Sequence, residues 1–266
     1  GMRSNIDVNG INDLLGPGGG SKLVARNAEA AIKVETGMKG VKIMNLMVSG
    51  GTEARNIGIH FVGATDNGML SNIIGINLHT GVKIEQAKNM QIVNCWVCEL
   101  PNSIELIGGE NIVVKNCQLG AQPTGITCKV QEVNKLSFIN NQVYPDGREN
   151  LVLDACNNCV IEGNNFKSYY NGILVLNGND NTVNKNIFWL TGAVQNQLLD
   201  HGDDFGIINV KGNNNMVASN SLSCEWAYAG AVTVNAVQGT GNVFKNCFVD
   251  NLESYRVFLV NAQTEV

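Results

Sequence analysis

Short runs of alternating hydrophobic and polar residues recur along the whole chain and predict many β-strands of similar length. Most of these runs are β-branched and begin with a glycine or a small polar residue. They are GVKIE (81–85), SIELI (103–107), GITCK (125–129), NLVLD (150–154), GILVL (172–176), GIINV (206–210) and AVTVN (231–235). The period of two residues places one side of each strand in a core and the other side outward.

Asparagine returns at a regular interval between these strands. Most intervals are 22 to 27 residues, and one interval of 34 residues indicates an insertion at about 189–204. The aligned positions form one column: Asn45, Asn72, Asn94, Asn116, Asn140, Asn164, Asn186, Asn220 and Asn246. We interpret this column as a ladder of buried amides that hydrogen-bond from one repeat to the next.

A strand, a turn, another strand and a return every 22 to 27 residues is typical of one coil of a solenoid. We therefore predict an all-β fold, a right-handed single-stranded parallel β-helix of about nine or ten coils. The β-helix domain is expected over residues 31–266, with residues 1–30 as an N-terminal opening or cap segment.

Composition narrows the possible partners. Of the 266 residues 44% are hydrophobic, enough for a large core, and only 15% are charged. The net charge of −5 argues against a nucleic-acid partner, because no basic stripe is available for phosphates. No apolar stretch is long enough to span a membrane. No signal peptide is visible, and we expect an extracellular or periplasmic rather than a cytoplasmic location.

The cysteines invite a metal site that the repeat argues against. Cys95-x-x-Cys98 and Cys156-x-x-Cys159 have a spacing that zinc sites use. They fall about three coils apart, roughly 14 Å at the usual strand spacing, too far for one zinc ion. Cysteines also follow ladder asparagines directly, in a column shared with aliphatic residues: Cys95, Cys117 and Cys247, with Leu46, Ile73 and Ile187. We predict that these cysteines fill the core and bind no metal.

The outward face of the strands divides into two regions. One is a charged cluster, expected to form a groove for an extended polymer: His60, Lys83, Glu85, Glu105, Lys129 and Asp154. The other is an apolar stripe on coils six to eight: Val152, Leu174, Leu176, Ile208 and Val210. An exposed stripe of this length predicts a subunit interface, or a cover made by a terminal segment or by the 189–204 insertion.

Four stretches together carry a family resemblance. They are ELPNSIEL (99–106), YPDGR (144–148), GNNFKSYYNGI (163–173) and GDDFGIINVKGNNNMVASN (202–220). From about residue 56 to 260 the chain resembles the inulin fructotransferases, which form difructose anhydrides on a parallel β-helix. The resemblance implies intramolecular fructosyl transfer on inulin-type chains, no cofactor and a homotrimer.

The chain also departs from this family. Family members have a longer N-terminal portion, and an aspartate about eleven residues before the glutamate of the ELPN motif. Lys88 stands at that position here. A changed substrate, linkage or product is consistent with this difference, and so is a loss of catalysis.

The resemblance selects the candidate site residues. Glu99 matches the family's catalytic position, and we expect the turn beside Trp96 and Pro101 to shield it from water. Glu105 is expected to converge on the same pocket, as the base or to orient a sugar hydroxyl. The candidate substrate-binding residues are His60, Lys83, Glu85, Arg148, Asp154, Tyr170, Asp203 and Asp204.

Within one chain Glu105 and Asp203 are about four coils apart, roughly 19 Å, so they can share a site only across a trimer interface. A purely structural alternative also exists for the glutamates. In it Glu99 caps its turn, and Glu105 pairs with Lys83 or Lys129 on a neighbouring coil.

Two other functions fit the same sequence. A non-catalytic carbohydrate-binding or adhesion module is consistent with Lys88 in place of the expected acid. A pectate-type lyase would need a calcium-binding acidic cluster on the exposed strands, and the charged cluster has too few acids for it. In each case the expected partner is an oligo- or polysaccharide.

Overall fold

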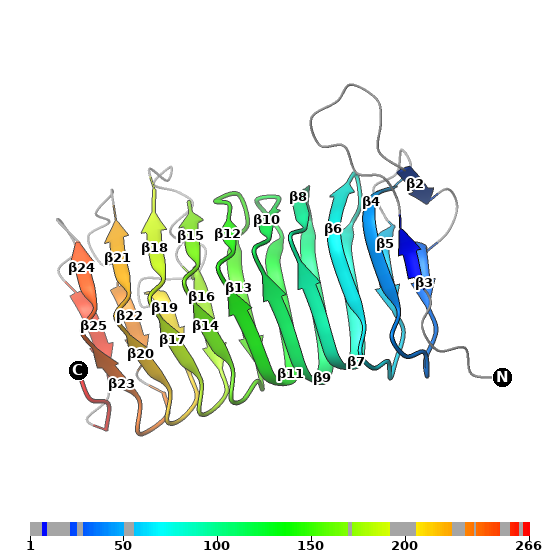
Figure 1. The fold of residues 1–266 in the computed structure, drawn as a ribbon. Helices are drawn as coiled ribbons and strands as arrows, with labels where there is room; N and C mark the ends of the chain where they lie inside the picture. The colour runs from blue at the N-terminus through cyan, green and yellow to red at the C-terminus, as the bar shows by residue number, and fades with distance from the viewer. Residues whose placement is uncertain are drawn as a thin grey trace.

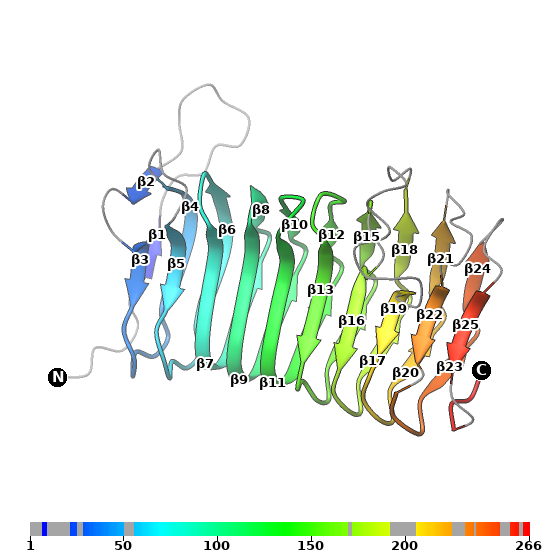
Figure 2. The ribbon, with the colours of Figure 1, turned by 180° about the vertical axis from the view of Figure 1, so that it is seen from behind.

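The computed structural model describes residues 7–9, 22–25, 29–50, 56–169, 172–191, 206–224, 232–236, 238–250, 256–260 and 263–266. In this part of the chain all regular structure is β, and no helix is present that could cross a membrane. The strands pair in parallel and wind into a solenoid with three sheets along its sides (Figures 1 and 2). The predicted parallel β-helix is confirmed.

The sheets are named by their order within a coil. The first sheet contains β3 (Ala30–Val34), β5 (Ile57–Phe61), the first halves of β7 (Thr80–Val93), β9 (Asn102–Lys115) and β11 (Ile126–Ile139), then β13 (Glu149–Asp154), β16 (Leu174–Asn177), β19 (Gly206–Val210), β22 (Val232–Ala236) and β25 (Arg256–Val260).

The second sheet contains β1 (Asp7–Asn9), the first parts of β4 (Lys42–Gly50) and β6 (Met69–Ile76), the second halves of β7, β9 and β11, then β14 (Val160–Glu162), β17 (Thr182–Asn184), β20 (Met216–Ala218) and β23 (Val243–Lys245). The third sheet contains β2 (Lys22–Ala25), the second parts of β4 and β6, then β8 (Trp96–Leu100), β10 (Gln118–Ala121), β12 (Gln142–Val143), β15 (Asn165–Ser168), β18 (Ile187–Leu190), β21 (Ser221–Cys224) and β24 (Phe248–Asp250).

Two corners of the coil position the sites discussed below. Corner A joins the first sheet to the second and lies along the edge where β7, β9 and β11 bend (Figure 1). Corner B joins the third sheet to the first, as between β8 and β9. Residues with positive φ make the bends. Most of those other than glycine are asparagine, which tolerates the left-handed region better than most residues with a side chain.

The asparagine ladder is present, but the predicted column combines two adjacent ones. Asn45, Asn72, Asn94, Asn116, Asn140 and Asn246 have φ between 52° and 56° and form the turn itself. The buried ladder is one residue further along: Asn141, Asn164, Asn186 and Asn220, joined by amide-to-amide hydrogen bonds of 2.9–3.1 Å. Single-sequence alignment missed this shift because a glycine, lysine or serine makes the turn in the later coils.

Cysteine occupies the same inward position in earlier coils. The backbone N–H of Cys117 donates to Asn141 Oδ1 at 2.9 Å, so cysteine and asparagine share one column. Cys95 and Cys117 are buried, and their thiols donate to backbone carbonyls at 3.3 Å. Their interpretation as core residues is confirmed, whereas Ile187 lies outside this column with 48% of its side chain exposed.

The predicted apolar stripe is wrong. Leu174 and Leu176 pair in register with Leu151 and Leu153 of the neighbouring coil and point into the core with them. Ile208 and Val210 follow the same inward columns. The sequence alignment of these coils slipped by one residue, and a one-residue slip exchanges the two faces of a strand. The outward residue beside Val152 is Val175, and the interface argument from an apolar stripe no longer holds.

Candidate functional site

The charged cluster brings three of the candidate binding residues together on the first sheet. Glu85 Oε1 lies 3.0 Å from Lys83 Nζ and 3.4 Å from Nε2 of His60, on the preceding strand. His60 is only 4% exposed, and its Nδ1 lies 3.7 Å from Glu29 Oε1. The imidazole is thus enclosed between two carboxylates, and the cluster joins β5 to β7.

Glu85 is held in its charged form within this cluster. Burial favours the neutral acid, but hydrogen bonding and charge attraction from Lys83 and His60 outweigh it and lower the pKa of Glu85. The carboxylate is therefore ionised at neutral pH. Such a group orients a sugar hydroxyl by accepting a hydrogen bond, and it is not a proton donor.

Glu105 lies on the outward column of His60 and Lys83, one coil beyond Lys83. The register places it directly between Lys83 and Lys129. Asp154 lies on the adjacent outward column, where its Oδ1 accepts a 2.7 Å hydrogen bond from Asn177 Nδ2. Within the described residues Glu105 and Glu99 share no hydrogen bond, and their expected convergence stays a prediction.

Glu99 occupies a β-bulge at corner B. The pairing of β8 with β10 shifts register here, with Val97 opposite Leu119 and Leu100 opposite Ala121. Glu99 has a φ of 64°, so it adopts the left-handed conformation at the extra residue. A bulge turns one side chain out of the regular alternation, and strained residues of this kind concentrate at functional sites.

The bulge exposes Glu99 rather than shielding it. Its side chain points to solvent, so the expected desolvation by Trp96 and Pro101 is wrong within a single chain. A substrate or a second subunit would have to supply the shielding.

A second carboxylate, that of Asp146, lies at the same corner as Glu99 and is not among the site residues that the sequence predicts. The pKa of the buried Cys98 thiol is raised to about 12 by burial and by the negative charges of Glu99 and Asp146. Asp146 follows β12 at corner B, two coils beyond Glu99, or roughly 10 Å along the axis. It belongs to YPDGR, and aligning the corner turns rather than the strands would have revealed it.

Aromatic side chains lie along the third sheet on the coils that follow Glu99. Tyr144 packs over Gly120, where an added Cβ would meet its side chain at 3.0 Å, and its hydroxyl donates to Gln118 at 2.9 Å. Further along, Lys167 Nζ lies 4.7 Å from the ring centre of Trp189. Partly exposed rings next to polar groups provide the apolar platform and fixed hydrogen bonds that sugars need.

The remaining candidates are only partly placed. Arg148 lies two residues after Asp146 at corner B, with Nε 3.8 Å from Glu149 Oε1. Tyr170, Asp203 and Asp204 lie outside the described residues, as does most of the 189–204 insertion.

Cys98 provides a test of this arrangement. We expect Glu99→Gln and Asp146→Asn each to lower the pKa of Cys98, because each removes a negative charge that disfavours the thiolate. Alkylation of Cys98 between pH 8 and 10, followed by mass spectrometry, should be faster in both variants. Glu162→Gln, on the outer surface of β14, is the matched control. Unchanged rates would show that the two carboxylates are not near the thiol.

Comparison with known proteins agrees with this architecture. Residues 124–266 match the family model described as right handed beta helix region, over more than half of the chain. The chain belongs to this family. Comparison with curated protein sequences gave no match. The predicted right-handed fold is therefore shown.

Solved structures extend the likeness to the whole chain. DFA-IIIase from Arthrobacter chlorophenolicus A6 without its lid aligns with a TM-score of 0.83 and 20% identity, over 99% of this chain and 78% of that one. The same enzyme in complex with GF2 gives a TM-score of 0.82 at 20% identity, over the same shares of both chains. An alginate lyase from Paenibacillus sp. str. FPU-7 gives 0.64 at 12% identity, over 88% of this chain and 91% of that one. The predicted resemblance is thus confirmed in the fold, which this chain shares with DFA-IIIase and with the alginate lyase.

Proposed function

We propose that this protein is a fructan-active enzyme that transfers a fructosyl unit intramolecularly and releases a difructose anhydride from inulin-type chains. Its support is the corner B site, where Glu99 lies in a bulge, and where Asp146 and Tyr144 lie two coils further along the same side of the solenoid. The bulge is the observation that carries the proposal, because the register shift at Glu99 turns this side chain out of the regular alternation, and bulges are over-represented next to active sites.

The chemistry needs a proton donor and a proton acceptor. A hydroxyl of the terminal fructose unit attacks the anomeric carbon of its neighbour, forming one C–O bond as the bond to the remaining chain breaks. In the proposal Glu99 gives its proton to the leaving oxygen, and a second carboxylate takes the proton of the attacking hydroxyl. Glu105 is the residue expected from the sequence, and Asp146 is the one whose charge acts on the same thiol as that of Glu99. His60, Lys83 and Glu85 would bind sugar hydroxyls further along the face.

A homotrimer belongs to the same proposal. Lys88 and Glu99 lie at corners A and B, separated by the width of the first sheet, roughly 20 Å for six strand residues. Residues at these two positions can act on the same bond of a substrate only across a contact between chains. A second chain over corner B would also shield the exposed Glu99. Light scattering at micromolar concentration should give three times the mass of the chain, and a monomer would exclude this assembly.

The activity is tested directly on the substrates. Incubation with inulin and with levan, followed by chromatography, should yield a difructose anhydride from inulin and little free fructose. Free fructose as the main product would indicate hydrolysis instead. Binding without any product would favour the carbohydrate-binding module, for which Lys88 is the specific observation.

A further inference from the structure

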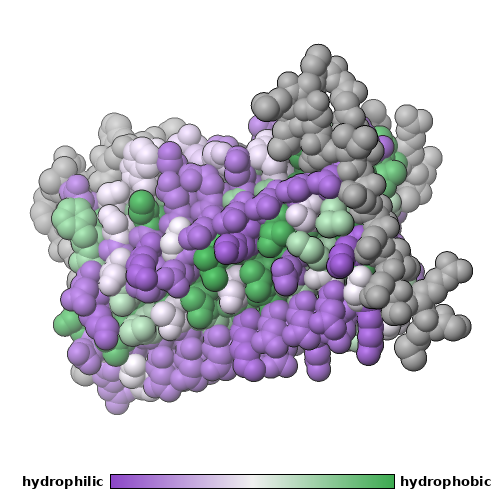
Figure 3. All heavy atoms as spheres, in the orientation of Figure 1, coloured by the Kyte–Doolittle hydropathy of each residue, from purple (hydrophilic) through white to green (hydrophobic). Residues whose placement is uncertain are grey.

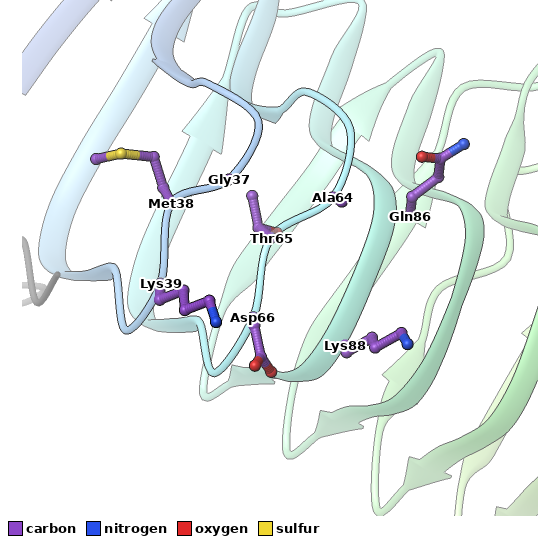
Figure 4. A pocket seen from close by; sticks show the side chains of 8 residues that line it. All are labelled: Gly37, Met38, Lys39, Ala64, Thr65, Asp66, Gln86 and Lys88. Carbon is purple, nitrogen blue, oxygen red and sulfur yellow. The ribbon is translucent and has the colours of Figure 1, made fainter. Parts of the chain in front are cut away.

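The residues that line a cleft at corner A include Lys39, Asp66 and Lys88 (Figure 4). Lys88 already belongs to the proposed assembly, so this cleft is no separate site. A feature that the proposed function does not use lies at the C-terminal end of the third sheet, where β18, β21 and β24 follow one another (Figure 1). Its middle strand β21 is five coils from the strand of Glu99, roughly 24 Å along the axis.

Two large apolar side chains are exposed there on either side of a serine. Ile187, Ser221 and Phe248 pair in register and point outward on the three successive strands. Ile187 is 48% exposed and Phe248 is 66% exposed, whereas most large apolar side chains of the described residues are buried. Figure 3 shows apolar residues over β18 and β24, with paler residues between them, at the left of the view. The small serine thus leaves a gap that is two strand spacings wide.

The neighbouring outward column continues the gap. Trp189, Ser223 and Asp250 follow one another in register on the same three strands. Lys167, on the preceding strand, has its Nζ 4.7 Å from the ring centre of Trp189. One face of this ring is therefore covered by Lys167, and the other face points to the following coil, where Ser223 is too small to cover it. Asp250 lies on the far side of the gap.

We call this gap the serine slot. It has Ile187 and Trp189 on one wall, Ser221 and Ser223 on its floor, and Phe248 and Asp250 on the other wall. The buried rings of Phe166 and Phe188 show the spacing of the coils here, 4.9 Å between ring centres. The two walls are two spacings apart, or roughly 10 Å. A ring between them lies about 5 Å from each wall, which suits a puckered ring with C–H groups on both faces, because a flat aromatic ring packs at only about 3.5–4.0 Å.

The serine slot is too small for a protein partner. Two strand spacings and two columns cover roughly 70 Å², against about 800 Å² on each partner of a stable protein interface. Its chemistry suits a single sugar ring instead. Trp189 and Phe248 offer apolar faces to C–H groups, while the serine hydroxyls and the Asp250 carboxylate bond to sugar hydroxyls. The same carboxylate repels an anionic ring.

We infer that the serine slot binds one neutral sugar ring of a carbohydrate chain. The two faces of the ring contact Trp189 and Phe248, and its hydroxyls donate to Asp250 and pair with the two serines. The slot is remote from Glu99, so it holds the chain without taking part in bond cleavage. The neutral ring follows from the slot itself, and only the identity of the chain as a fructan rests on the proposed function.

Binding at the serine slot can be measured in the Glu99→Gln variant, so that a short inulin oligosaccharide is not consumed. In protein carrying 5-fluorotryptophan, the ¹⁹F signal of Trp189, assigned by its loss in Trp189→Phe, should shift and saturate as the oligosaccharide is added. Ser221→Leu fills the slot and should weaken this binding at least about tenfold. Ser137→Leu is the matched control, the same change on the outer face of the second sheet, and should leave the affinity unchanged.

A second variant removes one wall of the slot. Phe248→Ala should also weaken binding at least about tenfold, and it should leave the melting temperature unchanged because this ring is mostly exposed. An unmoved Trp189 signal, or full affinity in either Ser221→Leu or Phe248→Ala, would overturn the inference. So would a Trp189 signal that shifts with protein concentration alone, which would place a second copy in the slot, or tighter binding of an oligouronate than of the neutral chain.

The proposed function and the serine slot can fail separately. If Glu99→Gln keeps its turnover of inulin while the Trp189 signal still saturates, the catalytic assignment is wrong and the slot stands. If the protein forms a difructose anhydride but the Trp189 signal does not move, the slot is wrong and the proposed function stands.

Discussion

Glu99→Gln should reduce turnover of inulin at least about a hundredfold, the lower end of what general acid catalysis contributes. Glutamine keeps the length and shape of the side chain but has no proton to give to the leaving oxygen. The free energy of unfolding should change by no more than about 0.5 kcal/mol, since the side chain is exposed. Initial rates from chromatography and urea denaturation measure the two effects.

Two further variants separate catalysis from backbone strain. Glu99→Gly should also lose turnover, yet it should stabilise the protein by up to about 1 kcal/mol, because glycine adopts a φ of 64° without the cost that a side chain adds. Glu132 is the matched control, an exposed glutamate with a φ of 55° at corner A, and Glu132→Gln should keep full activity. Full activity in Glu99→Gln would remove the catalytic assignment.

The assignment of the second carboxylate follows from the same assay. If Asp146 is the base, Asp146→Asn should lose turnover while Glu105→Gln mainly weakens substrate binding. If Glu105 is the base, Glu105→Gln should lose turnover while Asp146→Asn mainly weakens substrate binding. The register favours a pairing role for Glu105, because it lies between Lys83 and Lys129.

The repeat predicted the fold because each coil repeats the same physical requirements. The strands must alternate, and the turns must adopt positive φ, which asparagine and glycine do at low cost. The sequence did not show which residues of each strand face the core. Taking glycine as the start of each strand places Leu174 and Ile208 outward, whereas their pairing with Leu151 fixes them inward.

The sequence predicts the site residues that lie on regular strands, and it fails where the alternation of the strand is broken. His60, Lys83 and Glu85 lie on regular strands, where counting by two places them on one face. Glu99 was selected by resemblance, but its bulge breaks the alternation, so neither its exposure nor its distance from Glu105 could be counted along the chain. Asp146 lies in a corner turn, which a strand-by-strand alignment does not compare.

The buried ladder should be far more sensitive to substitution than the turn beside it. Asn164 is 1% exposed and makes four hydrogen bonds. Its Oδ1 accepts from the backbone N–H of Asn141 at 2.8 Å and from Asn141 Nδ2 at 3.1 Å, and its Nδ2 donates to Phe138 O at 2.8 Å and to Asn186 Oδ1 at 2.9 Å. Asn164→Ala removes all four bonds. Asn186 Oδ1 keeps the bond from the backbone N–H of residue 164, but the buried backbone N–H of Asn141 loses its partner, and a buried unpaired group costs about 1–3 kcal/mol.

We therefore expect Asn164→Ala to lower the free energy of unfolding by at least about 3 kcal/mol, because the partners can relax only in part. Asn140→Ala, in the exposed turn with a φ of 54°, should cost only about 1 kcal/mol, the difference between asparagine and alanine in the left-handed region. Asn141→Cys should fall between them, since Cys117 already occupies the next position of the column. Urea denaturation followed by circular dichroism gives the three values. Equal losses for Asn164→Ala and Asn140→Ala would mean that the amide ladder adds no more stability than a turn residue.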